Sequence, residues 1–247
     1  MSLPVAILAG GLATRLRPLT ERVPKVLLDV AGKPFAVRQI ELLKEHGLKE
    51  IVFCLGHLGE QVETSLGDGS RWGVKLNYVF DGPRPQGTGG ALRRALPFLG
   101  EAFLVLYGDS YLDCDYEEII RAFRTAGKQA LMTVFRNAGQ WDRSNVLFQG
   151  GRIQRYDKQL PSREMQHIDY GLGVLQAGVI EAYPSGESLD LADIYQHLLA
   201  KGELAGFEVK QRFYEIGSLD GLEETRRYFA KERCDGNNLH TTSPPRS

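Results

Sequence analysis

Segments with the patterns of strands and helices alternate through the first half of this sequence. Four short apolar runs have the composition of buried strands: 4–9, 50–55, 74–80 and 102–107. Three segments between them have the spacing of amphipathic helices: 35–46, 59–66 and 88–96. Parallel strands need crossover helices of this kind. The alternation therefore predicts a mostly parallel sheet with helices on both faces, whose ligands lie beyond the carboxyl ends of the strands.

The pattern changes after a helix that is expected at 116–126. Four strand-like segments joined by short polar turns follow: 129–135, 145–148, 152–157 and 168–176. Two helices are expected after them, near 190–200 and 218–231. We interpret these strands as a mixed or antiparallel extension that covers the far edge of the sheet.

No clear linker interrupts the 247 residues, of which 43% are hydrophobic. Residues 1–233 are therefore expected to form a single domain, with a first half at about 1–128 and a second half at about 129–233. The polar residues 234–247, which are rich in helix breakers, are expected to form a disordered tail.

Charge and cysteine content exclude several classes of protein. The formal net charge is −1, so neither nucleic acid nor an anionic membrane surface is an expected partner, because both need a basic surface. No apolar run approaches the roughly 20 residues of a membrane span. Cys54, Cys114 and Cys234 are few, odd in number and without metal-binding spacing. This pattern favours a protein of the reducing cytoplasm.

The first apolar run leads into two adjacent glycines, Gly10 and Gly11. A glycine turn after a buried strand presents backbone N–H groups with no side chain in the way. Arg15 follows Gly10 by five residues and Lys25 follows Arg15 by ten. Bare amides, a planar guanidinium and a mobile ammonium together suit a polyphosphate. The string lacks the Gly-x-Gly-x-x-Gly spacing of a dinucleotide fold and the Gly-Lys-Ser/Thr ending of a Walker loop.

The stretch from Gly10 to Lys25 resembles the signature of the sugar-1-phosphate nucleotidyltransferases, the nucleotide-sugar pyrophosphorylases. Every fixed position of Gly-Gly-x-x-x-Arg-Leu-x-Pro-Leu-Thr-x-x-x-Pro-Lys is present, and the resemblance covers roughly residues 3–231. It implies a Rossmann-like, three-layer α/β fold with a mixed, mostly parallel sheet. The first half would bind the nucleotide, and the second would bind the sugar with a small β extension. The implied reaction is attack of a sugar 1-phosphate on the α-phosphate of a nucleoside triphosphate, with release of pyrophosphate.

The resemblance implies three catalytic residues. Arg15 would hold the β- and γ-phosphates and the departing pyrophosphate, and Lys25 would reach toward the α-phosphate. Asp109, in a Gly-Asp motif at the tip of the strand at 102–107, is the expected first ligand of Mg²⁺. Glu215 stands where the family's late Asp-Ile/Val-Gly-Thr motif has Asp. Its longer side chain could still reach the ion, so it is the expected second ligand.

Further motifs imply contacts with both substrates. The expected nucleotide-binding residues lie in the first glycine turn and before the helix at 88–96: Leu8, Ala9, Gly10, Gly11, Asp81, Gln86, Gly87 and Thr88. Thr88 is also the expected N-cap of that helix. The expected residues at the sugar phosphate are Asn145, Asp157, Lys158 and Gly171. Asn145 replaces the glycine that relatives usually have there, which indicates an unusual sugar or a different fit.

The residues leave the identity of the substrates open. The short form of the chain resembles the heptose 1-phosphate guanylyltransferases and the N-acetylmuramate 1-phosphate uridylyltransferases. GTP with a heptose or hexose 1-phosphate is favoured, because Asp81 could accept hydrogen bonds from guanine N1 and N2. Gln86 could pair with either base. Three alternatives stay open: UTP with an amino-sugar 1-phosphate, a cytidylyltransferase for phosphocholine, and a regulatory subunit that binds nucleotide sugars without turnover. The expected product is an NDP-sugar for capsule or lipopolysaccharide, and a homo-oligomer is left open.

Overall fold

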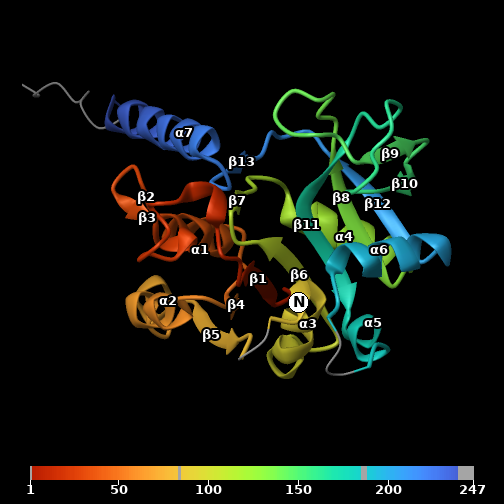
Figure 1. Ribbon diagram of the computed structural model, residues 1–247, viewed down its shortest axis with the longest axis horizontal. Helices are drawn as coiled ribbons and strands as arrows, with labels where there is room; N and C mark the ends of the chain where they lie inside the picture. Colours follow the sequence, from red (N-terminus) through yellow and green to blue (C-terminus); the bar gives the residue numbers. More distant parts are fainter. Residues whose placement is uncertain (1, 83–84, 185–187, 239–247) are drawn as a thin grey trace, which may run out of the picture.

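The centre of the computed structural model is a seven-stranded sheet with the order β12-β8-β11-β6-β1-β4-β5 (Figure 1). The structure describes residues 2–82, 85–184 and 188–238. The strands of the sheet are β1 (Val5–Ala9), β4 (Glu50–Leu55), β5 (Lys75–Phe80), β6 (Ala102–Tyr107), β8 (Ala130–Phe135), β11 (Ile168–Gln176) and β12 (Leu204–Val209). All of them run parallel except β11, which is antiparallel to both of its neighbours.

Helices cover both faces of the sheet, because its side chains alternate between two apolar clusters. In β1, Val5 and Ile7 belong to one cluster and Ala6 to the other, and all three are fully buried. The first cluster includes side chains of α1 (Phe35–Glu45), α2 (Gly59–Leu66) and α4 (Tyr116–Ala126). The second includes side chains of α3 (Gly87–Ala95), α5 (Ala177–Glu181) and α6 (Leu191–Ala200). The result is the three-layer α/β fold that the sequence predicts.

Three two-stranded sheets lie outside the central one. One is the hairpin of β9 (Val146–Gln149) and β10 (Arg152–Tyr156), and another joins β2 (Asp29–Val30) to β3 (Lys33–Pro34). The third pairs β7 (Ser110–Tyr111) with β13 (Tyr214–Glu215). In that ladder Glu215 lies opposite Ser110, and the backbone N–H of Ile216 donates to the carbonyl of Asp109 at 2.8 Å. Two segments more than 100 residues apart thereby meet at the carboxyl end of β6.

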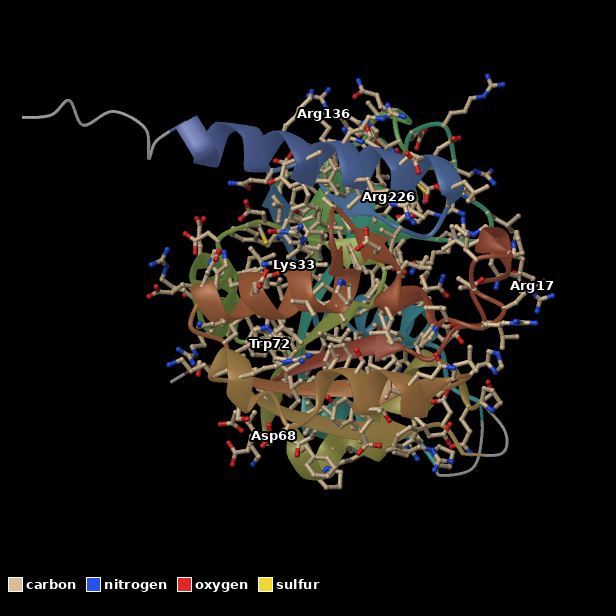
Figure 2. The ribbon with its side chains drawn as sticks, turned by 90° about the vertical axis from the view of Figure 1, so that its left-hand side faces the viewer. Arg17, Lys33, Asp68, Trp72, Arg136 and Arg226 are labelled. Atoms are coloured by element: carbon tan, nitrogen blue, oxygen red, sulfur yellow. The ribbon has the colours of Figure 1, made fainter. Side chains whose placement is uncertain are left out.

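A long C-terminal helix, α7 (Leu219–Asn238), lies across β2, β3 and α1 (Figure 1). Its buried side chains Leu222 and Phe229 belong to a third apolar cluster, together with Leu16, Val30 and other residues. Arg226 extends from the side of α7 that faces the molecule (Figure 2), and its Nε donates to the carbonyl of Asp29 at 3.0 Å. This helix therefore fastens the C-terminal segment to residues 16–30.

Several elements differ from the pattern expected from sequence, among them α5 and the ladders β2–β3 and β7–β13, which were not expected. Strand β12 was not expected either, and it pairs with β8 at the edge of the central sheet. Because β8 and β11 belong to the central sheet as well, only β9 and β10 of the four predicted extension strands lie apart from it. Helix α7 continues to Asn238, so residues 234–238 are helical, whereas 239–247 lie outside the described residues. Adding a residue to an existing helix costs much less than starting one, which explains the longer helix. Among the described residues, no helix is long and apolar enough to cross a membrane.

Candidate active site

Four of the expected site residues converge around Gly217, which follows β13. A Cβ added to this glycine would lie 2.7 Å from Glu215 Oε2, 3.2 Å from Asp109 Oδ2 and 3.3 Å from Arg15 Nη2. Lys25 joins the group, because its Nζ donates to Asp109 Oδ2 at 2.6 Å. Two carboxylates and two cations thus share a small space at the carboxyl end of β6, where ligands of such sheets bind.

The turn that carries Asp109 is held by a buried glutamine of α1. The Nε2 of Gln39 donates to the carbonyl of Tyr107 at 3.3 Å and to that of Ser110 at 2.9 Å. Gln39 is only 1% exposed, so burial and two hydrogen bonds fix its amide. Because these carbonyls flank Asp109, the glutamine fixes the backbone from which the carboxylate extends.

Arg15 lies in a single 3₁₀ turn, Thr14–Leu16, within the signature loop. Ala13 begins this turn with φ 46°, and its carbonyl accepts a hydrogen bond from Thr20 Oγ1 at 2.8 Å. Leu16 is fully buried and anchors the turn in the third apolar cluster. Arg17 points away from the molecule at the rim of the loop (Figure 2). The loop therefore directs only one of its first two arginines, Arg15, to the site.

Glu215 has a second task at the start of α7. Its Oε1 accepts a hydrogen bond from Ser218 Oγ at 2.7 Å, and its Oε2 accepts one from the backbone N–H of Gly217. A carboxylate in this place is favourable because the first N–H groups of a helix lack partners and the helix dipole is positive there. Glu215 therefore holds Ser218 in place, and the Ser218 hydroxyl in turn accepts from the N–H of Gly221 in the first turn of α7 at 3.0 Å.

The two carboxylates suit a divalent cation of the magnesium type. Mg²⁺ prefers hard oxygen ligands, and it usually takes one or two protein carboxylates together with phosphate oxygens of the substrate. Asp109 and Glu215 supply such oxygens. Among the described residues there is no group of three or more His, Cys, Asp or Glu side chains that could hold a metal ion. The remaining ligands of such an ion would be phosphate oxygens of the substrate and water.

One of the two phosphate-binding cations, Arg15, lines the same cavity of about 880 Å³ as three of the four sugar-binding candidates, whereas Lys25 is not among its lining residues. Expected site residues in its wall are Arg15, Asp109, Asn145, Lys158, Gly171 and Glu215. The cavity is also lined by residues that were not predicted from the sequence, among them Tyr107, Trp141, Arg143, Asp169, Arg212 and Phe213. Of these, Trp141 and Arg212 contact each other, with the guanidinium carbon 4.4 Å from the ring centroid. No sequence motif marked this contact, because the two residues are 71 positions apart.

Lys158 is already paired where it lines the cavity. Its Nζ lies 3.2 Å from Asp169 Oδ2 and donates to Tyr107 Oη at 3.0 Å. Asn145 belongs to the same network, since its Oδ1 accepts a hydrogen bond from the backbone N–H of Asp169 at 2.9 Å. Gly171 completes it with φ 90°, and its N–H donates to Asp169 Oδ1 at 3.1 Å. Three expected sugar-site residues thus meet at Asp169, an acid that the sequence analysis did not select.

Asp157 does not line this cavity. Its carboxylate accepts hydrogen bonds from the backbone N–H groups of Leu160 at 2.8 Å and Gln159 at 3.0 Å, and it pairs with Arg155. These bonds, the one from Leu160 first, lower the pKa of Asp157. The side chain therefore organises its own turn, because an aspartate followed by free N–H groups readily accepts from them.

The nucleotide-side candidates lie at the neighbouring strand ends. Asp81 follows β5, and a Cβ added to Gly10 would lie 2.7 Å from its Oδ2. The backbone N of Gly56, which follows β4, lies 3.4 Å from the same position. Burial raises the pKa of Asp81, and Arg94 opposes this rise. Gly10 is thus a position where a side chain would collide with the carboxylate that is expected to contact the base.

Thr88 caps a different helix from the one expected. Helix α3 begins at Gly87, so Thr88 lies inside its first turn and its cap position belongs to Gln86. The hydroxyl of Thr88 donates to Asp190 Oδ1 at 2.9 Å and accepts from the N–H of Leu191 at 2.7 Å. It therefore joins the start of α3 to the start of α6, a contact between residues 103 positions apart.

Comparison with known proteins identifies the family of this chain. A family model described as Nucleotidyl transferase matches residues 5–232. The chain is 29% identical over 215 residues to UTP--glucose-1-phosphate uridylyltransferase of Synechocystis, covering 79% of this chain and 55% of the relative. It is 47% identical over 124 residues to N-acetylmuramate alpha-1-phosphate uridylyltransferase of Neisseria meningitidis, covering 49% and 51%. It is 34% identical over 206 residues to the low-salt glycan biosynthesis nucleotidyltransferase Agl11 of Haloferax volcanii, covering 79% and 57%.

The matches thus span little more than half the length of these curated relatives. Among solved structures, a putative glucose-1-phosphate thymidylyltransferase from Bacillus anthracis superposes with a TM-score of 0.81 at 23% identity, covering 92% of this chain and 95% of that one. HddC from Yersinia pseudotuberculosis complexed with GMP-PN superposes with a TM-score of 0.77 at 24% identity, covering 92% and 100%. These identities show a shared fold. Because the family model covers most of the chain, this protein belongs to the nucleotidyl transferase family.

Proposed function

We propose that this protein is an enzyme that transfers a nucleotidyl group from a nucleoside triphosphate to a sugar 1-phosphate and releases pyrophosphate. The observation that carries the proposal is the meeting of Arg15, Lys25, Asp109 and Glu215 around Gly217. The cavity that begins there also contains Lys158. Side chains that would bind the phosphates of the nucleotide and of the sugar phosphate thus lie around one cavity.

The mechanism requires alignment and charge neutralisation rather than a base. A sugar phosphate is already ionised at neutral pH, so its oxygen can attack the α-phosphorus directly while pyrophosphate leaves from the opposite side. Lys158 would hold the attacking phosphate, Lys25 would contact the α-phosphate, and Arg15 would stabilise the leaving pyrophosphate. Asp109 and Glu215 would hold Mg²⁺, which when bound offsets the charge of the phosphate oxygens.

Two observations bear on the identity of the nucleotide and of the sugar phosphate. Asp81 favours GTP because a carboxylate beside Gly10 can accept from both N1 and N2 of guanine, and a heptose or hexose 1-phosphate would be the acceptor. The name of the Neisseria meningitidis relative favours UTP with an amino-sugar 1-phosphate instead. We propose that the product serves cell-surface glycan synthesis and that the enzyme works in the cytoplasm, where nucleoside triphosphates are abundant.

The test is release of pyrophosphate in the presence of Mg²⁺, with GTP, UTP, CTP, dTTP and ATP supplied one at a time. Each nucleotide is combined with heptose, hexose and amino-sugar 1-phosphates, and separately with phosphocholine. Release that requires one nucleotide and one sugar phosphate supports the proposal and identifies both substrates. Release only with phosphocholine would replace it with a cytidylyltransferase.

A protein that binds a nucleotide sugar but releases no pyrophosphate in any combination would instead be a regulatory subunit. Equilibrium binding of GDP-sugars and UDP-sugars by calorimetry separates this outcome from inactivity. The Asp81→Asn variant checks the choice of base. If the enzyme uses GTP, the neutral amide should lower kcat/KM for GTP by about tenfold, because one charged acceptor is lost. An unchanged kcat/KM for GTP would show that Asp81 does not contact the base.

A further inference from the structure

Asp169 is a nearly buried carboxylate with partners on every side. It comes from β11, and its side chain is 4% exposed. Its Oδ1 accepts from the N–H of Gly171 at 3.1 Å, and its Oδ2 accepts from Tyr156 Oη at 3.2 Å. The same Oδ2 lies 3.2 Å from Lys158 Nζ. A buried carboxylate needs such partners, because an unpaired charge in the interior is very unfavourable.

The ammonium of Lys158 is covered on one side and open on the other. Asp169 and the Tyr107 hydroxyl contact it from the sheet, at 3.2 Å and 3.0 Å. Its Nζ is also 4.8 Å from the centroid of the Tyr107 ring. The side chain nevertheless stays 38% exposed and lines the cavity. A phosphate can therefore approach from the cavity while the carboxylate keeps its place beneath.

We propose that Asp169 is the positioning residue for Lys158 and fixes its ammonium at the point where the phosphate of the acceptor binds. Asp169 borders the cavity, but its side chain is only 4% exposed and its oxygens are already bonded to Gly171, Tyr156 and Lys158, so we assign it this role and not a contact with the acceptor. A lysine side chain has many rotamers, and holding it in one of them lowers the entropic cost of binding. That the bound phosphate belongs to a sugar rests on the proposed function, whereas the pairing of the two residues does not.

The proposal has a consequence for the charge of Lys158. The titratable and charged groups around its ammonium are Tyr107 in β6, Tyr156 in β10 and Asp169 in β11, and the Arg155–Asp157 ion pair adjoins Lys158 in the sequence. Burial lowers the pKa of Lys158, but Asp169 and Tyr107 outweigh it and raise that pKa above its usual value. An Asp169→Asn variant keeps the burial and loses the carboxylate, so its Lys158 should lose the proton at lower pH.

A double-mutant cycle tests whether Asp169 acts through Lys158. In the wild-type background, Asp169→Asn should raise KM for the acceptor and lower kcat/KM by about tenfold or more, while KM for the nucleotide changes less than about threefold. In a Lys158→Met background the same change should have almost no further effect. Equal losses in both backgrounds would overturn the proposal. Glu208→Gln is the matched control, since it removes a carboxylate that pairs with His167 and Lys210 outside the cavity.

A second readout needs no turnover. Acetylation of Lys158 by acetic anhydride is followed by mass spectrometry across a pH series, with exposed Lys201 as the internal reference. The pH at which Lys158 becomes reactive should fall in Asp169→Asn and stay unchanged in Glu208→Gln. An unchanged profile in Asp169→Asn would overturn the proposal.

The two readouts separate this proposal from the proposed function. Suppose that the wild-type protein turns over no sugar phosphate, but that the acetylation profile of Lys158 still shifts in Asp169→Asn. The pairing of Asp169 with Lys158 would then be supported, and the proposed reaction would be wrong. If Asp169→Asn does not fold, Tyr107→Phe takes its place. It removes only the hydroxyl that accepts from Lys158. The expected result is a smaller loss in the same direction, confined to KM for the acceptor, and a change in kcat alone would count against the proposal.

Discussion

At the scale of single residues, the site depends on two lysines that are paired with acids before any substrate binds. Lys25 contacts Asp109 at 2.6 Å, and Lys158 contacts Asp169 at 3.2 Å. The two pairs differ in burial, because 26% of the Asp109 side chain is exposed and only 4% of that of Asp169. Under the proposed function the partly exposed Asp109 would exchange Lys25 for a metal ion, whereas the buried Asp169 would keep Lys158.

Lys25→Ala should lower kcat/KM by about 10² or more, because a charge contact made in the transition state is lost. The measurement is steady-state pyrophosphate release. Lys33→Ala is the matched control, because Lys33 forms an equally short ion pair, 2.6 Å to Glu41, beside α1 and away from the cavity (Figure 2). Activity of Lys25→Ala within threefold of wild type would remove Lys25 from the reaction.

Glu215→Gln should raise the Mg²⁺ concentration needed for half-maximal activity by roughly tenfold or more, because a neutral amide is a weaker ligand than a carboxylate. Titration of Mg²⁺ in the pyrophosphate assay measures this. Glu223→Gln is the control, since Glu223 lies on α7 and pairs with Arg226. If both variants respond alike to Mg²⁺, Glu215 serves only to hold Gly217 and Ser218 at the start of α7.

At the scale of elements, short ladders and caps bring the two halves of the chain together. The β7–β13 ladder places Glu215 opposite Ser110, and Thr88 in α3 bonds to Asp190 and Leu191 at the start of α6. The strand and helix positions themselves follow from local apolar spacing, which is why most of them could be predicted. Which helix Thr88 caps could not, because its partners are more than 100 residues away.

Thr88→Val should destabilise the protein by about 1 kcal/mol or more, since it leaves the N–H of Leu191 without its side-chain acceptor and removes a bond to Asp190. Urea unfolding followed by circular dichroism gives the change. Thr64→Val is the control, because Thr64 is exposed and its hydroxyl bonds only within α2, to Glu60. Its effect should stay below about 0.5 kcal/mol. Equal effects of the two substitutions would show that the link between α3 and α6 adds no stability.

At the scale of the whole molecule, the two apolar clusters on either side of the sheet each bury a thiol. Cys114 belongs to the first cluster and Cys54 to the second. Burial raises the pKa of each from 9.0 to about 12, with added repulsion from Asp81 at Cys54 and from Asp113 and Asp115 at Cys114. Above pH 9 the unfolded chain therefore loses protons that the folded protein keeps.

The free energy of unfolding should consequently be constant with respect to these thiols below pH 9 and fall as pH rises toward about 12. Each thiol contributes a slope of up to about 1.4 kcal/mol per pH unit. Urea unfolding between about pH 8 and about pH 11 measures the slope, and the range follows from the same linkage. Cys54→Ala should reduce the slope of the unfolding free energy against pH by the contribution of one thiol. A slope unchanged by this substitution would mean that the buried thiol does not drive the alkaline loss of stability.

The sequence by itself determined the elements and the phosphate-binding loop. Apolar spacing predicts strands such as 50–55 and helices such as 59–66, which the structure contains as β4 and α2 with the same bounds. The string from Gly10 to Lys25 indicates the family, because a glycine turn and its cations lie close together in the chain. Such features depend on interactions over a few residues, and these can be interpreted before any fold is known.

Only the tertiary structure decided which side chains meet. Asp169 carries no motif, yet burial makes it the partner of Lys158, whereas Asp157, which a motif selected, bonds to its own turn. Glu215 reaches Asp109 because β13 pairs with β7. These contacts join distant segments, and they form only where the packing of the whole sheet excludes water and brings the partner groups within hydrogen-bonding distance of each charge.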